Sequence, residues 1–135
     1  MPEGTPAVRV LDLSVFALAN TSQFNPVDVH FKIEPVELLR VHVLVPTGVV
    51  GLAGWHLVWQ RQVIVPWGNR FAWITGNGQL FTFNVGLVVT GELVVETYSD
   101  DLRYDHLIRA WAEVTDVGPG PGAAPSAPAP LVVLA

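Results

Sequence analysis

A period of two in the apolar residues, repeated in short runs, is the feature that most constrains this fold. In VHFKIE (29–34) the odd positions are Val, Phe and Ile, and the even positions are His, Lys and Glu. Side chains of a β-strand point alternately to its two faces, so such a run predicts a half-buried strand. Runs of similar β-prone character occupy residues 8–18, 38–45, 55–65, 69–74, 79–85, 92–98 and 106–114.

The segments between these runs are rich in turn residues. They include NPVD, PTG, GLAG, PWGN, TGNG, TG and SDD, and Asn77-Gly78 suits a type I′ hairpin turn. No segment combines a helical period with helix caps. About eight short strands without helices predict an all-β fold, an antiparallel β-sandwich of jelly-roll or immunoglobulin-like topology.

The chain of 135 residues is long enough for one domain. Residues 1–7 form a short polar lead, and residues 8–117 are expected to form the β-sandwich domain. Residues 118–135 are a Pro/Gly/Ala-rich arm that ends in the apolar residues Leu131, Val132, Val133 and Leu134. The arm is either a disordered tail or an extended segment that docks its apolar end on a sheet edge, in cis or on a neighbouring subunit.

Composition limits the class of protein. Half of the residues are apolar and only 14% are charged, against about 25% in an ordinary domain. The apolar excess predicts either a fully buried two-sheet core or surface that other subunits cover. The apolar runs are too short for a membrane span. The seven basic residues are scattered and the net charge is −5, which argues against nucleic-acid binding.

Cysteine and targeting signals add two expectations. The chain has no cysteine, which excludes a disulfide scaffold and thiolate zinc sites. The first residues, MPEGTPAVRV, show neither a basic n-region nor an apolar h-region. We therefore expect no secretory signal and synthesis in a cytosol.

The segment YSDDLRYDH (98–106) has the densest group of chemically active residue types. Its acids Asp100, Asp101 and Asp105 do not follow the spacing of a calcium loop. Asp105 and His106 are adjacent on an expected strand, so they point to opposite faces and cannot share one ion. We predict a structural corner without metal or cofactor. In it Asp100 and Asp101 cap turn N–H groups, and Tyr104 and His106 form hydrogen bonds.

The remaining residues give no catalytic pattern. The serines lack a nucleophile elbow, cysteine is absent, and no carboxylate pair has a recognisable spacing. The other histidines, His30, His42 and His56, fall in separate expected strands. The sequence therefore predicts a protein that is not an enzyme.

The tryptophans suggest a contact surface. Trp67 lies in a Pro-Trp-Gly turn and should be partly exposed, with Asn69 and Asn77 in the same 66–78 loop region. Exposed aromatic side chains stack on sugar rings or on partner proteins. Trp73, and one of Trp55 and Trp59, are expected to fill the core.

Residues 63–114 carry a resemblance to a known class. The pattern combines a Pro…Trp-Ile-x-x-Gly turn (Pro66, Trp73, Ile74, Gly76), Gly-x-Leu-x-Val (Gly91, Leu93, Val95), and Tyr98 and Asp101 before Tyr104, Asp105 and His106. It resembles small β-sandwich structural proteins of tailed phages that infect actinobacteria, of the minor tail or minor capsid and decoration type.

The resemblance implies a virion structural protein, made in the host cytoplasm. Its partners would be further copies of itself and other virion proteins, and the class supplies no catalytic residues. The alternative that the tryptophans support is a glycan-binding β-sandwich module with a surface glycan as partner.

Overall fold

The structure is a computed structural model that describes residues 7–117, and all regular secondary structure within that range is β-strand. The chain forms an all-β antiparallel fold of eight strands, as the sequence predicts. The strands are β1 (Val8–Asp12), β2 (Val15–Ala17), β3 (Val27–Val45), β4 (Ala53–Trp59), β5 (Gln62–Val65), β6 (Trp67–Gly68), β7 (Gln79–Ser99) and β8 (His106–Asp116).

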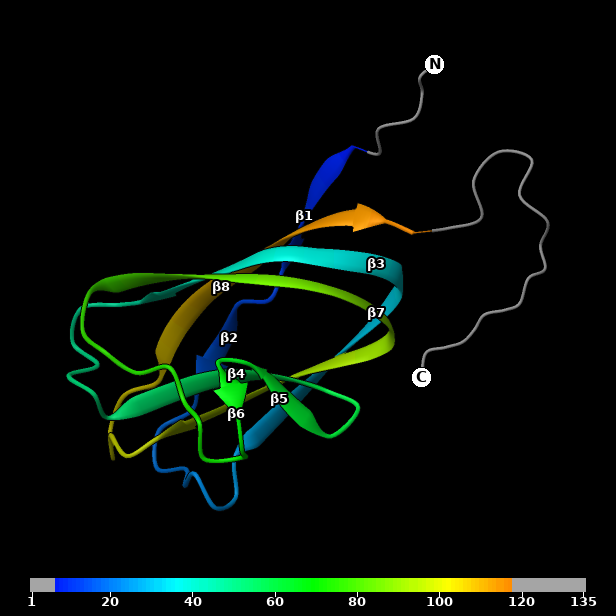
Figure 1. The fold of residues 1–135 in the computed structure, drawn as a ribbon. Helices are drawn as coiled ribbons and strands as arrows, with labels where there is room; N and C mark the ends of the chain where they lie inside the picture. Colours follow the sequence, from blue (N-terminus) through cyan, green and yellow to red (C-terminus); the bar gives the residue numbers. More distant parts are fainter. Residues whose placement is uncertain (1–6, 118–135) are drawn as a thin grey trace, which may run out of the picture.

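Two very long strands organise the fold. β3 and β7 pair antiparallel from Val27↔Thr97 to Val45↔Gln79. Their register shifts between Ile33 and Val36, and Gly91 lies opposite Ile33 with φ +88°. A bulge and a left-handed glycine bend a strand pair, and Figure 1 shows β3 and β7 curving together around one end of the molecule.

The bend gives the fold its two layers. The second half of β3 and the first half of β7 continue into β8 and β1. The first half of β3 and the second half of β7 continue into β4, β5 and β6. The strand order β1-β8-β3-β7-β4-β5-β6 is therefore one sheet folded over itself, which gives a β-sandwich-like arrangement (Figure 1).

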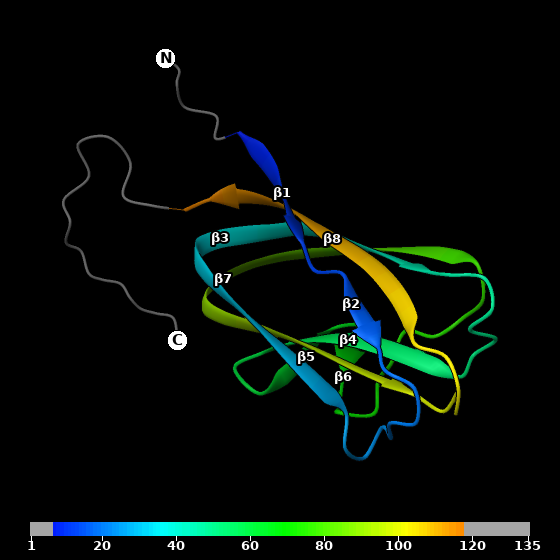
Figure 2. The same ribbon diagram turned by 180° about the vertical axis from the view of Figure 1, so that it is seen from behind.

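The N-terminal strands β1 and β2 follow one register along β8. Asp12 pairs with Trp111 and Val15 with Ile108, so the two strands form one edge, interrupted at Leu13 and Ser14 (Figure 2). The Ser14 hydroxyl fills the interruption, because it donates to the Ala110 carbonyl (3.3 Å) and accepts from the Ala110 N–H (3.0 Å).

The core lies between the two layers. In β3 the side chains of Val41, Val43 and Val45 are buried, and Arg40 and His42 point outward, as the alternation predicts. In β8 Ile108, Ala110, Ala112 and Val114 are buried in the same way. Trp55 is fully buried, and Trp59 is partly buried against the same core.

Several expected strand boundaries were wrong. Residues 29–34 and 38–45 belong to the single strand β3, and 79–85 and 92–98 to β7. The Thr90-Gly91 pair was expected to make a turn. Instead Gly91 uses its left-handed φ within a continuous, bent strand.

The expected strand 55–65 is a hairpin. Gln60 and Arg61 form the two-residue loop between β4 and β5, with φ values of +51° and +65°. Positive φ at both loop positions is the type I′ arrangement, which usually needs Asn or Gly. The sequence therefore carried no turn signal here.

Two local expectations around residues 69–78 also failed. Residues 69–74 contribute one isolated bridge, between Ile74 and Trp55. Asn77-Gly78 does not form a type I′ turn, because φ is positive at Gly78 but not at Asn77. Asn77 instead uses its side chain to hold another loop.

No helix in the described range is long and apolar enough to cross a membrane. The arm residues Leu131, Val132, Val133 and Leu134, and most of the lead 1–7, lie outside the described residues.

Candidate functional site

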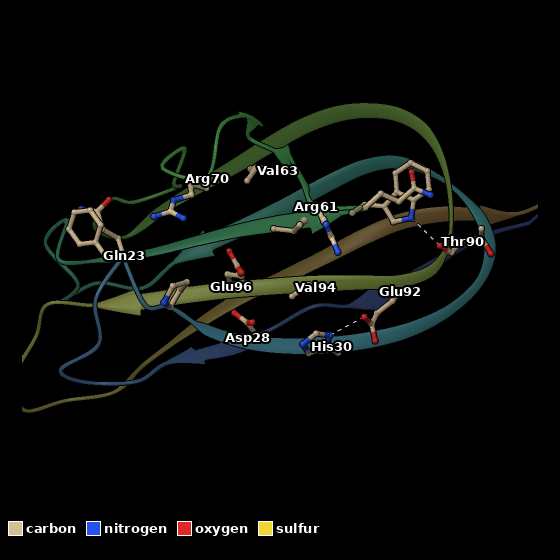
Figure 3. Close-up of a pocket in the computed structure, with 15 residues that line it drawn as sticks. Gln23, Asp28, His30, Arg61, Val63, Arg70, Thr90, Glu92, Val94 and Glu96 are labelled. Carbon is tan, nitrogen blue, oxygen red and sulfur yellow. Dashed lines mark hydrogen bonds and ion pairs between the residues drawn. The ribbon is translucent and has the colours of Figure 1, made fainter. Parts of the chain in front are cut away.

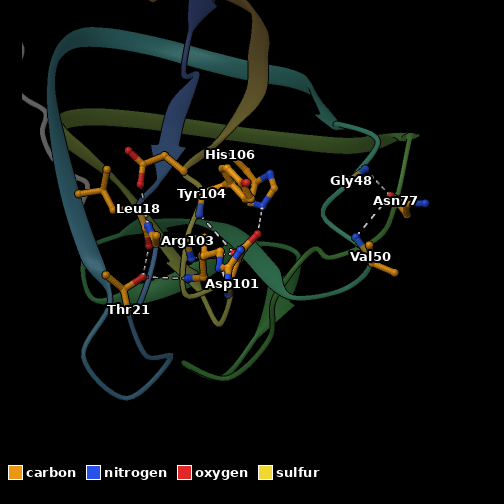
Figure 4. A network of polar contacts seen from close by, with 12 residues as sticks. Leu18, Thr21, Gly48, Val50, Asn77, Asp101, Arg103, Tyr104 and His106 are labelled. Atoms are coloured by element: carbon orange, nitrogen blue, oxygen red, sulfur yellow. Dashed lines mark hydrogen bonds and ion pairs between the residues drawn. The ribbon is translucent and has the colours of Figure 1, made fainter.

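The corner after β7 is held by Asp101. Its Oδ1 accepts the N–H groups of Arg103 (2.9 Å) and Tyr104 (3.2 Å), and its Oδ2 lies 2.8 Å from His106 Nε2 (Figure 4). The backbone N–H of Arg103, followed by His106, lowers the pKa of Asp101. This is capping chemistry that fixes a turn.

Of the other corner residues, only some form side-chain hydrogen bonds. Asp105 Oδ1 accepts the N–H of Ala19 at 2.8 Å, which ties the corner to the loop after β2. Tyr104 is 64% exposed. Within residues 7–117 no hydrogen bond joins the Tyr104 or Asp100 side chain to another group, so the expected roles of these two were wrong: the turn N–H groups are already satisfied by Asp101.

The predicted contact residues do not form one cluster. Trp67 is 72% exposed on β6. Asn69 Oδ1 accepts the N–H of Phe71 (2.9 Å) in its own turn. Asn77 Oδ1 accepts the N–H groups of Gly48 (2.7 Å) and Val50 (3.3 Å), and Figure 4 shows it reaching across to the loop after β3.

All four histidines pair with a carboxylate. The partners are Glu92 for His30 (3.0 Å), Glu113 for His42 (2.5 Å), Glu96 for His56 (2.6 Å) and Asp101 for His106 (2.8 Å). His30 and His42 share the single strand β3, contrary to the expectation of separate strands. The described residues contain no group of three or more His, Asp or Glu side chains arranged to hold a metal ion.

The network on the outer face of β8 is structural. Arg40 binds Glu113 through two nitrogens (3.1 and 2.7 Å), and His42 binds the same carboxylate. These contacts, Arg40 first, lower the pKa of Glu113 to about 2. The His42 ring also stacks on Trp111, with ring centroids 5.2 Å apart. Both carboxylate oxygens of Glu113 thus bond to neighbouring side chains.

A second group of polar residues surrounds a hollow of about 570 Å³ on the outer face of the layer that contains β4. β3 contributes Asp28 and His30, and β7 contributes Glu92, Val94 and Glu96. The β4–β5 turn supplies Arg61, and the loop after β6 supplies Arg70. Figure 3 shows the two arginines on the side of the hollow opposite Asp28 and His30.

Three adjacent strands align Asp28, Glu96 and His56 in one row. Asp28 pairs with Glu96 across β3 and β7, and Glu96 pairs with His56 across β7 and β4. His56 is fully buried and stacks on Trp73 with ring centroids 3.7 Å apart. Trp73 is thus packed over the outer face of β4.

The row brings two carboxyl groups and a buried histidine together. The two ring nitrogens of His56 face oxygens, the Ala72 carbonyl (2.9 Å) and Glu96 Oε1 (2.6 Å), and Asp28 lies opposite Glu96 on the adjacent strand. Burial, followed by the adjacent Glu96, raises the pKa of Asp28.

Sequence reasoning missed this hollow. The polar positions of VDVHFKIE and GELVVETY each alternate with apolar ones, which indicates exposed faces. Only the antiparallel register joins those two faces, and register over so long a strand pair depends on the two bulges, which no local pattern reveals.

Comparisons with known proteins give no family. No family model matches the chain, and no curated protein matches it. Among solved structures, the chain is similar to a chain in the structure of infectious bursal disease virus Gx strain, with 14% identity and a TM-score of 0.38. The match covers 82% of this chain and 32% of that chain, so the protein spans about a third of the neighbour's length.

Proposed function

We propose that this protein is a virion structural subunit of a tailed phage, tail-associated or capsid-decorating, that acts through contacts between subunits and not as an enzyme. The proposal is supported by the free edge of β7. Residues 79–90 of β7 pair with β3 on one side, and no strand within residues 7–117 pairs with the other side.

This free edge lacks the usual protection. Monomeric proteins place charges, prolines or covering loops on edge strands, because a bare edge templates pairing with another chain. The segment QLFTFNVGLVVT (79–90) has no charged residue and no proline. Its inward side chains Phe81, Phe83, Val85 and Leu87 are only partly buried against the core. An added strand would cover them.

The N-terminal edge supports the same role. Val8 and Val10 on β1 are 56% and 59% exposed, and Phe16 on β2 is 52% exposed. These side chains lie along the outer strand at the opposite edge of the same layer, which is likewise unpaired on its far side within the described range. The resemblance of residues 63–114 to phage β-sandwich proteins agrees with a repeating subunit.

The arm gives the proposed contact a specific partner. We place the apolar end Leu131–Leu134 on the free edge of β7 of a neighbouring copy, by strand addition.

The test follows the protein through a density gradient of phage particles, with full-length protein and a variant lacking residues 118–135. The full-length protein should band with particles in a fixed ratio, and the shortened protein should incorporate less. A full-length protein that stays at the top of the gradient would refute the virion role. Equal incorporation of both forms would refute the role of the arm.

A second candidate function is glycan binding, as a receptor-binding or lectin-like module. The observation that favours it is Trp67, which exposes 72% of its surface on β6. A panel of oligosaccharides should then quench tryptophan fluorescence, and Trp67→Ala should abolish the response if this side chain makes the contact.

A further inference from the structure

The hollow on β3, β7 and β4 has the size of a small-ligand site. Its volume of about 570 Å³ falls within the ~300–1,000 Å³ typical of such sites. It extends along β7 from Glu96 to Thr90, roughly 20 Å at about 3.3 Å per residue. Trp59 lines the Thr90 end, where its Nε1 donates to the Thr90 carbonyl (3.0 Å), and Phe24, packed edge-on against Phe71 at 5.6 Å, also lines the hollow.

The two walls carry complementary groups. One wall offers the carboxyl groups of Asp28 and Glu92 together with His30. The facing wall offers the guanidinium groups of Arg61 and Arg70. Neither arginine has a carboxylate of residues 7–117 within ion-pair distance. The hollow thus places hydrogen-bond acceptors opposite donors that no described carboxylate satisfies.

The conformation of Arg61 adds a second observation. Arg61 holds φ +65° in a turn where Gly or Asn would be relaxed. A left-handed backbone conformation is sterically strained for a residue with a Cβ. Strained residues of this kind cluster at functional sites, and here the Arg61 side chain reaches over the hollow (Figure 3).

We propose that the hollow binds a short saccharide. Sugar hydroxyls donate to Asp28 and Glu92, and sugar oxygens accept from Arg61 and Arg70. The floor between the walls is made of Val58, Val63 and Val94, which suits the C–H face of a sugar ring. This inference rests on the second candidate function, glycan binding, but locates the sugar in the hollow rather than at Trp67.

A saccharide fits these observations better than a segment of protein. An extended peptide binds to sheets by adding a strand at an edge, and the hollow meets the free edge 79–90 only at its last residue, Thr90. The hollow lies on a sheet face. Its carboxyl and guanidinium groups can all be satisfied by a compact ligand that is rich in hydroxyl groups.

The test is titration of the full-length protein with a panel of neutral and uronic-acid oligosaccharides, followed by tryptophan fluorescence and calorimetry. The variants are Arg61→Gln and Asp28→Asn in the hollow and Trp67→Ala outside it, each checked by circular dichroism. We expect at least one oligosaccharide to bind, with affinity reduced tenfold or more by each hollow variant and unchanged by Trp67→Ala.

Each other outcome contradicts the inference in a distinguishable way. Binding that Trp67→Ala abolishes and the hollow variants leave intact would keep glycan binding and overturn the hollow as its site. No binding across the panel would overturn both. A hollow variant that changes the mass of the protein in solution, without any sugar binding, would assign the hollow to a protein contact instead.

Discussion

Asp28 and Glu96 lie opposite each other across β3 and β7, and burial, followed by the adjacent Glu96, raises the pKa of Asp28. A carboxyl with a raised pKa in the folded protein favours folding below its ordinary pKa, and loses that contribution as pH rises through the folded value. At neutral pH the ionised Asp28 therefore weakens the fold. Its position in the hollow (Figure 3) means that the same pair also sets the charge that a ligand meets.

Asp28→Asn should stabilise the protein at pH 7 relative to pH 4. The amide keeps a hydrogen-bond donor and removes the ionisation. Because Asp28 is exposed, the gain should be at most about 0.5 kcal/mol, the scale of surface substitutions. Urea unfolding at the two pH values measures it. Asp116→Asn is the control of opposite sign, since Arg9 lowers the pKa of Asp116 and the substitution should weaken the fold at pH 7. Equal effects of the two variants on stability would contradict a raised pKa for Asp28 beside a lowered pKa for Asp116.

The buried histidine of the same row should matter far more than its exposed neighbour. His56→Ala removes a fully buried ring that stacks on Trp73 and bonds to Glu96 and Ala72. We expect a loss of about 2–4 kcal/mol, because it leaves a cavity and unpaired acceptors. His30→Ala, at a ring that is half exposed, should leave the unfolding midpoint nearly unchanged. Denaturant unfolding compares them, and a similar loss for both would show that the row is not structural.

The sequence predicted the layers better than the connections. Alternation identified the buried faces of β3 and β8 correctly, because packing against a core selects apolar residues at every second position. It could not show that β3 and β7 pass through both layers. Glu34-Pro35 and Gly91 have the composition of turns, and only their opposition across the paired strands turns them into bulges.

The candidate sites show the same division. Asp101 could be expected to cap a turn from its place beside the strand end, since this chemistry is local. The hollow could not be predicted from the sequence, because Asp28, Glu96 and Arg61 come from three separate parts of the chain. The Gln60-Arg61 turn had no composition signal, and the structure holds it at positive φ without Asn or Gly.

That turn makes a prediction in which stability and binding change in opposite directions. Arg61→Gly should raise the free energy of unfolding by about 0.5–1 kcal/mol, because glycine accepts positive φ and the gain exceeds its extra unfolded entropy. It should also reduce saccharide binding, since the guanidinium is lost. Arg70→Gly is the matched control, because Arg70 does not hold positive φ and the substitution should lower stability. Thermal unfolding of both variants is the measurement. A loss of stability in Arg61→Gly would contradict the claim that the Arg61 backbone is strained.

Adjacent aspartates in the corner after β7 should respond differently. Asp101→Ala removes the acceptor for Arg103, Tyr104 and His106 and should lower Tm by a few degrees, as the loss of a cap does. Asp100→Ala should leave Tm unchanged. The pKa of Asp101 is lowered, so its contribution is present above the ordinary pKa of aspartate and is lost as pH falls through the lowered value. Thermal melts at pH 7 and at pH 3 should show the difference between the variants shrinking in acid.

The free edge of β7 gives the sharpest test of assembly. If neighbours add a strand there, a lysine on that edge should prevent it, because a charge on an edge strand opposes pairing. Asn84 is exposed and lies in the uncharged segment 79–90, so Asn84→Lys should lower the mass of the full-length protein in light scattering toward that of the monomer. Thr115→Lys makes the same change of charge on β8, which pairs with β1 and β3, and should leave the mass unchanged. If the wild type is already monomeric, or if both lysine variants dissociate it equally, then the edge of β7 is not where copies of this protein meet.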